Sequence, residues 1–250
     1  EKLNTGNCTT TTATVVVPVE PIVATPDVVT VTAGSTSSGS VIDNDHIGTA
    51  TTTTSTVSVT VVTPATPKGS GVATPTITNE GKVTVPNNTP AGTYTIVYRV
   101  CEKLNAGNCT TTTATVVVPL TPITATPDVV TVTAGGTSSG SVIDNDHIGT
   151  ATTTTSTVSV TVVTPATPKG SGVATPTITD EGKVTVPNNT PAGTYTIVYR
   201  VCEKLNAGNC TTTTATVVVP VEPIVATPDV VTVTAGSTSS GSVIDNDHIG

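Results

Sequence analysis

Pairs of cysteine residues supply the clearest local chemistry in this chain. Cys101 and Cys109 bracket the sequence EKLNAGN, and Cys202 and Cys210 bracket the same seven residues further along. Each pair stands between two runs that are typical of strands, TYTIVYRV and TTTTATVVV. A disulfide at these positions would therefore close a hairpin at its loop. Because the loop is small, the expected gain in stability is limited, about 2–3 kcal/mol.

Reduced thiols and a zinc site are the alternatives to disulfides. Two cysteines eight positions apart, with neither a His nor a second Cys pair beside them, make a poor zinc signature. We therefore expect disulfides, which indicate an oxidising compartment and hence export. Cys8 is left over, and we expect its partner to lie just before Glu1, outside this sequence.

The run Asp-Asn-Asp-His is the second candidate for chemistry, and it occurs three times. Carboxylate oxygens suit Ca²⁺, which takes six to eight oxygen ligands. The competing interpretation is that Asp and Asn cap a turn through hydrogen bonds to the backbone. We favour the turn, because further acidic residues near the joints are scarce. Calcium is the alternative, and no other cofactor is expected. Its candidate ligands are Asp43, Asp45, Asp144, Asp146, Asp245 and Asp247.

Catalysis and several partner classes are disfavoured. Ser38, Asp43 and His46 lie near one another in the sequence, but without the strand–turn–helix context of a nucleophile elbow. We expect no enzymatic activity. The net charge is −8, with 17 acidic and 9 basic residues and no basic cluster, which argues against nucleic acid and anionic membranes. No apolar run reaches the roughly 20 residues that membrane insertion requires.

All of these residues recur with a period of 101 positions. Glu1 returns as Glu102 and Glu203, and a long internal period is typical of an array of structural units. The first and second copies differ at only six positions, of which four revert in the third copy. The differing pairs are Thr5/Ala106, Val19/Leu120, Glu20/Thr121, Val23/Thr124, Ser35/Gly136 and Asn79/Asp180.

The composition predicts that each unit is built from strands. About a quarter of the residues are Thr, Val is the main apolar residue, and both are β-branched and suited to a pleated surface. No stretch keeps a helical apolar period. The core must be small, with two Tyr residues per unit as its largest members. Tyr94, Ile96, Tyr98 and Val100 alternate on one face, which we expect to be the inner one, so that Arg99 points outward.

Turn residues divide the complete unit at 21–121 into about seven strands. Asn79-Glu80-Gly81 is expected to form a hairpin turn. Short strands at this spacing favour an Ig-like or cadherin-like β-sandwich, repeated in tandem. The expected strands are 27–32, 40–42, 55–63, 74–78, 82–85, 93–100 and 110–118.

Proline pairs mark the joints between units. Two prolines three positions apart favour extended backbone and remove hydrogen-bond donors, so each linker should be short and semi-rigid. The pairs are Pro18 and Pro21, Pro119 and Pro122, and Pro220 and Pro223. They predict the C-terminal part of one repeat at 1–20, complete repeats at 21–121 and 122–222, and the N-terminal part of another at 223–250.

Two stretches of the unit resemble known repeats. TPDVVTVTAGSTSSGSVIDND resembles the opening of bacterial Ig-like and cadherin-like tandem repeats. AGTYTIVYRVCEKLNAGNC followed by TTTTATVVV resembles the repeats of giant Bacteroidota cell-surface adhesins, including those of gliding motility. The resemblance implies an exported, very long cell-surface filament, delivered by type IX secretion and involved in attachment or gliding.

We therefore expect the structural shaft of an extracellular adhesin filament at the cell surface. The expected partners are neighbouring repeats of the same chain and other filament chains. Surface glycans or abiotic surfaces would be met through a tip outside this sequence. The alternatives are a repeated module in which each unit binds a glycan or protein, and a shaft extender stiffened by Ca²⁺.

Overall fold

The computed structural model describes residues 2–3 and 5–249, and these contain strands and turns but no helix. No helix that could span a membrane is therefore found in the described part of the chain. The chain divides into two compact units, Glu1–Leu120 and Thr121–Gly250. Each complete repeat is a β-sandwich, as the strand pattern predicts.

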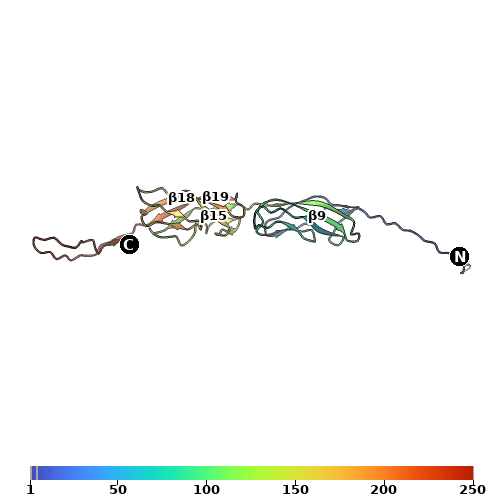
Figure 1. Ribbon diagram of the computed structural model, residues 1–250, viewed down its shortest axis with the longest axis horizontal. Coiled ribbons are helices and arrows are strands. Elements are labelled where there is room, and N and C mark those ends of the chain that lie inside the picture. Colours follow the sequence, from blue (N-terminus) through green and yellow to red (C-terminus); the bar gives the residue numbers. More distant parts are fainter. Residues whose placement is uncertain (1, 4, 250) are drawn as a thin grey trace. The chain divides into compact units, whose positions relative to one another are not determined.

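The larger sheet of the first unit has the strand order β2-β10-β9-β6. Strands β9 and β10 form a long antiparallel hairpin, and β2 lies beside β10 in parallel. Figure 1 labels β9, the longest strand of this unit. The bounds are β2 (Asp27–Thr30), β6 (Val57–Thr63), β9 (Gly92–Glu102) and β10 (Cys109–Val118).

Two smaller sheets complete the first unit. The order β3-β8-β7 makes the opposite layer of the sandwich, and β1-β4-β5 makes a small sheet of two-residue strands. The bounds of the first set are β3 (Ser35–Thr36), β7 (Thr76–Ile77) and β8 (Val83–Val85). Those of the second set are β1 (Ile22–Val23), β4 (His46–Ile47) and β5 (Ala50–Thr51).

The core lies between the two layers and is built from Val, Ile, Ala and Tyr. Residues of both sheets belong to one buried cluster. The predicted alternation in β9 is confirmed: Tyr94, Ile96, Tyr98 and Val100 are buried, whereas Arg99 is exposed. Tyr98 is the largest of the fully buried side chains in this unit. The period of two in the sequence therefore orients this central strand.

One expected strand is wrong. Residues 40–42 form a turn instead, held by hydrogen bonds from the Asp43 amide to the Ser40 carbonyl and from the Asp45 amide to the Ile42 carbonyl. Val41 and Ile42 are nevertheless buried, with 1% and 2% of their surface exposed. Apolar side chains can enter the core from a turn when nearby groups satisfy the backbone, so apolar content alone does not establish a strand.

The expected hairpin turn at residues 79–81 is confirmed. Thr78 and Lys82 flank it, and the Thr78 amide donates to the Lys82 carbonyl at 2.8 Å. Gly81 has a φ of +76°, in the left-handed region that glycine adopts without a steric cost. An added Cβ there would lie 2.3 Å from the Ser40 hydroxyl oxygen. The turn therefore requires glycine both for conformation and for space.

The second unit repeats this layout with one difference. Its large sheet has the order β12-β19-β18-β15. Gly136 replaces Ser35, and the strand there is reduced to a single bridge between Thr137 and Thr185. Glycine has no side chain to pack and weakens a strand. The bounds are β11 (Ile123–Thr124), β12 (Asp128–Thr131), β13 (His147–Ile148), β14 (Ala151–Thr152), β15 (Val158–Thr164), β16 (Thr177–Ile178), β17 (Val184–Thr185), β18 (Gly193–Glu203) and β19 (Cys210–Val219).

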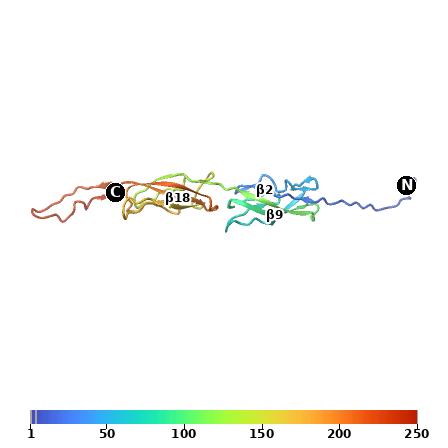
Figure 2. The ribbon, with the colours of Figure 1, turned by 90° about the horizontal axis from the view of Figure 1, so that it is seen from above.

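The two terminal segments have little regular structure. Residues 9–17 have the sequence of a segment of β10 but are exposed and outside any strand, and Figure 2 shows this N-terminal stretch in blue as extended chain. At the other end, β20 (Ile224–Val225) pairs only with β21 (His248–Ile249). Ile224 is 73% exposed, whereas its counterpart Ile22 is 7% exposed. Burial at this position therefore accompanies the complete unit.

Candidate functional site

A disulfide closes the loop end of the long hairpin in each unit. Cys101 and Cys109 lie opposite each other in the β9–β10 ladder, with their Cα atoms 4.1 Å apart, and their sulfur atoms are bonded. Cys202 and Cys210 are bonded in the same way. Cys8 is exposed and has no disulfide partner among the described residues. The strands therefore bring both predicted pairs together.

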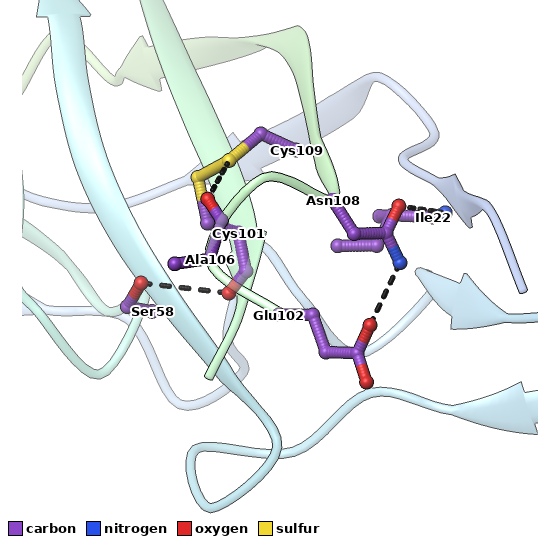
Figure 3. Close-up of a disulfide and its surroundings, with 7 residues drawn as sticks. All are labelled: Ile22, Ser58, Cys101, Glu102, Ala106, Asn108 and Cys109. Carbon is purple, nitrogen blue, oxygen red and sulfur yellow. Dashed lines mark hydrogen bonds between the residues drawn. A yellow bond between two sulfur atoms is a disulfide. The ribbon is translucent and has the colours of Figure 1, made fainter. Parts of the chain in front are cut away.

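The hairpin loop is held by a network around one carboxylate. Asn105 donates from Nδ2 to Oε1 of Glu102 at 2.8 Å, and Asn108 donates from Nδ2 to Oε2 at 2.8 Å. The Glu102 amide also donates to the Asn108 carbonyl at 3.0 Å. Both carboxylate oxygens are satisfied, which fixes the loop and the orientation of the Asn108 amide. Figure 3 shows Glu102 and Asn108 beside the disulfide.

The same asparagine binds the chain that enters the unit. Asn108 donates from Nδ2 to the carbonyl oxygen of Glu20 at 2.7 Å, and its Oδ1 accepts from the amide of Ile22 at 3.4 Å. The contact with Ile22 is drawn in Figure 3. One side-chain amide thus binds two backbone groups more than 80 positions away. We call Glu102, Asn105 and Asn108, with their counterparts in the second unit, the amide clamp.

The second unit contains the same clamp. Asn209 donates to the Thr121 carbonyl at 2.8 Å and to Oε2 of Glu203 at 2.6 Å, and it accepts from the Ile123 amide at 3.3 Å. Glu203 and Asn209 are 8% and 7% exposed. A buried carboxylate is costly unless its oxygens accept hydrogen bonds, and here two amides supply them.

Sequence reasoning missed this clamp. The seven residues between the cysteines are expected only to form a loop, in which the glutamate and the asparagines have no role. One signal was present: Glu102, Asn105 and Asn108 are unchanged in every copy, while Ala106 between them replaces Thr5.

The predicted proline linkers border the clamp. Pro18 and Pro21 precede β1, Pro119 and Pro122 lie between β10 and β11, and Pro220 and Pro223 lie between β19 and β20. The Pro21 carbonyl accepts from the Gly48 amide at 3.3 Å, and the Pro122 carbonyl accepts from Gly149 at the same distance. The incoming backbone is therefore bonded to the clamp and to the loop after β4 or β13.

The candidate calcium ligands act as caps. Asp43 accepts from the Ser40 amide at 2.8 Å, and Asp45 accepts from the Thr25 amide at 2.9 Å. The counterparts Asp144, Asp146, Asp245 and Asp247 make the same bonds in their repeats. Within residues 2–3 and 5–249, no group of three or more His, Cys, Asp or Glu side chains is placed to hold a metal ion. The geometry favours the turn.

Comparisons with known proteins add little beyond this geometry. No protein-family model matches the chain, and no curated protein matches it. Among solved structures, it is similar to the human desmocollin-1 ectodomain at 13% identity, covering 78% of this chain and 40% of that one, with a TM-score of 0.31. Human CDH23 EC21-23 matches at 14% identity over 82% of this chain and 70% of its own, with a TM-score of 0.30. Protocadherin gamma B2 extracellular cadherin domains 3–6 match at 10% identity, over 80% and 51%, with a TM-score of 0.30. Since these scores are low, the assignment to a repeated β-sandwich rests on the strands and core of the chain itself.

Proposed function

We propose that this chain is a stretch of the load-bearing shaft of an extracellular adhesin filament. The observation that carries the proposal is where the backbone enters and leaves each unit. It enters at Ile22, bonded to Asn108 beside the first residue of β10, and it leaves at Pro119, after the last residue of β10. Ten strand residues separate these points, about 30 Å at roughly 3.3 Å per residue. A unit with its two ends this far apart extends the chain.

The strand pairing suits a tensile load. Strand β2 lies parallel to β10, with Asp27 to Thr30 opposite Ala114 to Val117. Tension acts on the N-terminal side of β2 and on the C-terminal side of β10, so it pulls these neighbours in opposite directions along their length. The ladder is then loaded in shear, and its hydrogen bonds must break together rather than one at a time. β12 and β19 have the same arrangement.

The disulfide and the clamp secure the end where load enters. The covalent bond keeps β9 and β10 together at the loop, and the loop holds Asn108 against the incoming backbone. Disulfides form in oxidising compartments, which supports an extracellular location. Anchorage to a cell surface and a role in attachment or gliding motility, with type IX secretion, extend the proposal from the sequence resemblance.

The proposal also covers partners. Neighbouring repeats are the immediate partners, and other filament chains or surface glycans would be met elsewhere along the filament. We infer no enzymatic activity and no nucleic-acid partner, because the disulfide, the clamp and the capping aspartates of each unit all bond to groups of that unit.

Single-molecule stretching of the chain tests the proposal. We expect two unfolding events of similar force, one for each complete unit. With the disulfide intact, the residues between the cysteines do not extend. Reduction should therefore lengthen each step by about 24 Å, from a separation of eight residues at roughly 3.5 Å each less the 4.1 Å that the disulfide already spans. A chain with Cys101, Cys109, Cys202 and Cys210 all replaced by Ser is the control, and its step should not change on reduction.

Two results would overturn the proposal that this chain is a load-bearing shaft. One is extension without resolved unfolding events, which would mean that the units do not resist tension. The other is reproducible binding of surface glycans by a single repeat, measured on a glycan array, which would favour the repeated binding module.

A further inference from the structure

A buried tyrosine hydroxyl lies between two hydrogen-bond acceptors. Oη of Tyr98 is 2.6 Å from Oδ2 of Asp27 and 2.9 Å from the carbonyl oxygen of Val41. The hydroxyl has one hydrogen and can donate to one of them. Val41 contributes a carbonyl, which only accepts. Both contacts are hydrogen bonds when Asp27 is protonated and donates to Tyr98, while Tyr98 donates to Val41.

A second buried carboxyl lies nearby. Asp45 is fully buried, and its Oδ1 accepts from the Thr25 amide. Its Oδ2 is buried without a hydrogen-bond partner among the described residues. A buried ionised oxygen in this position is costly, whereas a protonated one is not charged. Of the surrounding groups, Asp43 adds a further negative charge near Asp27, and His46 favours the ionised form of Asp45.

The second unit repeats every part of this arrangement. Tyr199 is 2.6 Å from Asp128 and 3.0 Å from the Val142 carbonyl. Asp146 is fully buried, accepts from Thr126 through Oδ1, and has an Oδ2 without a partner among the residues described. The feature thus belongs to the repeat.

We propose that the pair Asp27 and Asp45, and its counterpart Asp128 and Asp146, holds a proton in mild acid and releases it towards neutral pH, so that each unit is strengthened by acid. The proton belongs to the pair, because two neighbouring carboxyls titrate together. Its loss leaves one of the two acceptors at Tyr98 without a hydrogen. The bond affected joins the first residue of β2 to the core and to the 41–45 turn. That strand is one side of the ladder loaded in shear under the proposed function.

The direction of the pH effect follows from burial. Desolvation raises the pKa of Asp27 from 3.8 to about 6 and that of Asp146 likewise to about 6, and it also raises the pKa of Asp45 and Asp128. The folded state then binds the proton more tightly than the unfolded state. The stabilisation is complete below pH 3.8 and is lost as the pH rises through about 6.

The size of the effect follows from the same shift. A rise from 3.8 to about 6 would change the folding equilibrium constant roughly a hundredfold per unit. Part of this change is already complete below pH 4.5. Because Asp27 is partly exposed, solvent screening reduces the remainder, and we expect about tenfold between pH 4.5 and 7.5.

Urea unfolding of the complete chain at pH 4.5, 6.0 and 7.5, with a chelator throughout, tests the proposal. The wild-type equilibrium constant for folding should fall about tenfold per unit from pH 4.5 to 7.5. The double variant Asp27→Asn and Asp128→Asn imitates the protonated side chain, and its pH dependence should be less than half as large on a logarithmic scale. The matched control, Glu80→Gln with Glu181→Gln at exposed turn positions, should keep the wild-type dependence.

Equal wild-type stability at pH 4.5 and pH 7.5, or greater stability at pH 7.5, would overturn the proposal. So would an unchanged pH dependence in the Asp27→Asn and Asp128→Asn variant. Carbon-13 NMR titration of the wild-type Asp carboxyls gives an answer even if that variant fails to fold. At least one carboxyl of each pair should titrate near pH 6, and titration of all Asp residues near pH 4 would refute the idea.

Discussion

Removal of one disulfide should lower the stability of one unit and leave its neighbour unchanged. The variant is Cys202→Ser with Cys210→Ser, in a background where the exposed Cys8 is also Ser so that thiol exchange cannot occur. The first unit, with Cys101 and Cys109 intact, is then an internal control of nearly identical sequence.

The magnitude follows from loop closure in the unfolded chain. The cysteines are separated by eight positions, and a closed loop of this size removes about 8 cal/mol/K of unfolded-state entropy. At 25 °C the loss of the bond therefore costs about 2.5 kcal/mol. A domain of about 100 residues loses roughly 4–8 °C in Tm per kcal/mol. The second unit should melt about 10–20 °C below the first.

Calorimetry measures both units in one sample. The parent should show one transition, and the variant should show two, since the stability of repeats is nearly additive. Melting of the variant as a single transition within about 3 °C of the parent would refute the reasoning. It would mean that the unfolded hairpin is already closed, or that the clamp alone holds the loop.

Three further perturbations test the clamp, a turn and the acidic run. Asn209→Ala removes one amide donor from the buried carboxylate of Glu203, so it should lower the free energy of unfolding in urea by about 1–3 kcal/mol and speed hydrogen exchange at the Ile123 amide. Unchanged exchange at that amide would contradict the clamp. Gly81→Ala places a Cβ 2.3 Å from the Ser40 hydroxyl oxygen at a φ of +76°, so the variant should lose about 1–3 kcal/mol of stability, measured as a lower Tm. An unchanged Tm would show that the turn relaxes around the added carbon. Addition of a chelator should leave the Tm unchanged, because the six candidate carboxylates cap turns, and a Tm that rises with added Ca²⁺ would contradict that role.

The strands that run through the core could be predicted because their pattern is local. In β9 and in the first half of β6, apolar residues alternate with polar ones, and the structure buries the alternating apolar set. The cysteine hairpin is local as well, since its two strands are joined by a short loop. A period of two and a turn signal are sufficient for such elements.

The features that depend on distant residues could not be predicted in this way. The parallel pairing of β2 with β10 joins residues about 87 positions apart, as between Asp27 and Ala114. The clamp joins Asn108 to Glu20 and Ile22 over a similar separation. Neither contact leaves a periodic trace in the sequence. The expected strand at 40–42 is a turn in the structure, because its apolar residues Val41 and Ile42 are buried without joining a ladder.

One variable position of the repeat is explained by what the clamp binds. Glu20 becomes Thr121 in the next unit, yet both carbonyls accept from the clamp asparagine, at 2.7 and 2.8 Å. Because the clamp contacts backbone atoms, the side chain there is free to change. Ile22, whose side chain is buried, is Ile again at the matching positions. Variation at the joint can therefore alter the surface of the linker while the hold on the backbone stays the same.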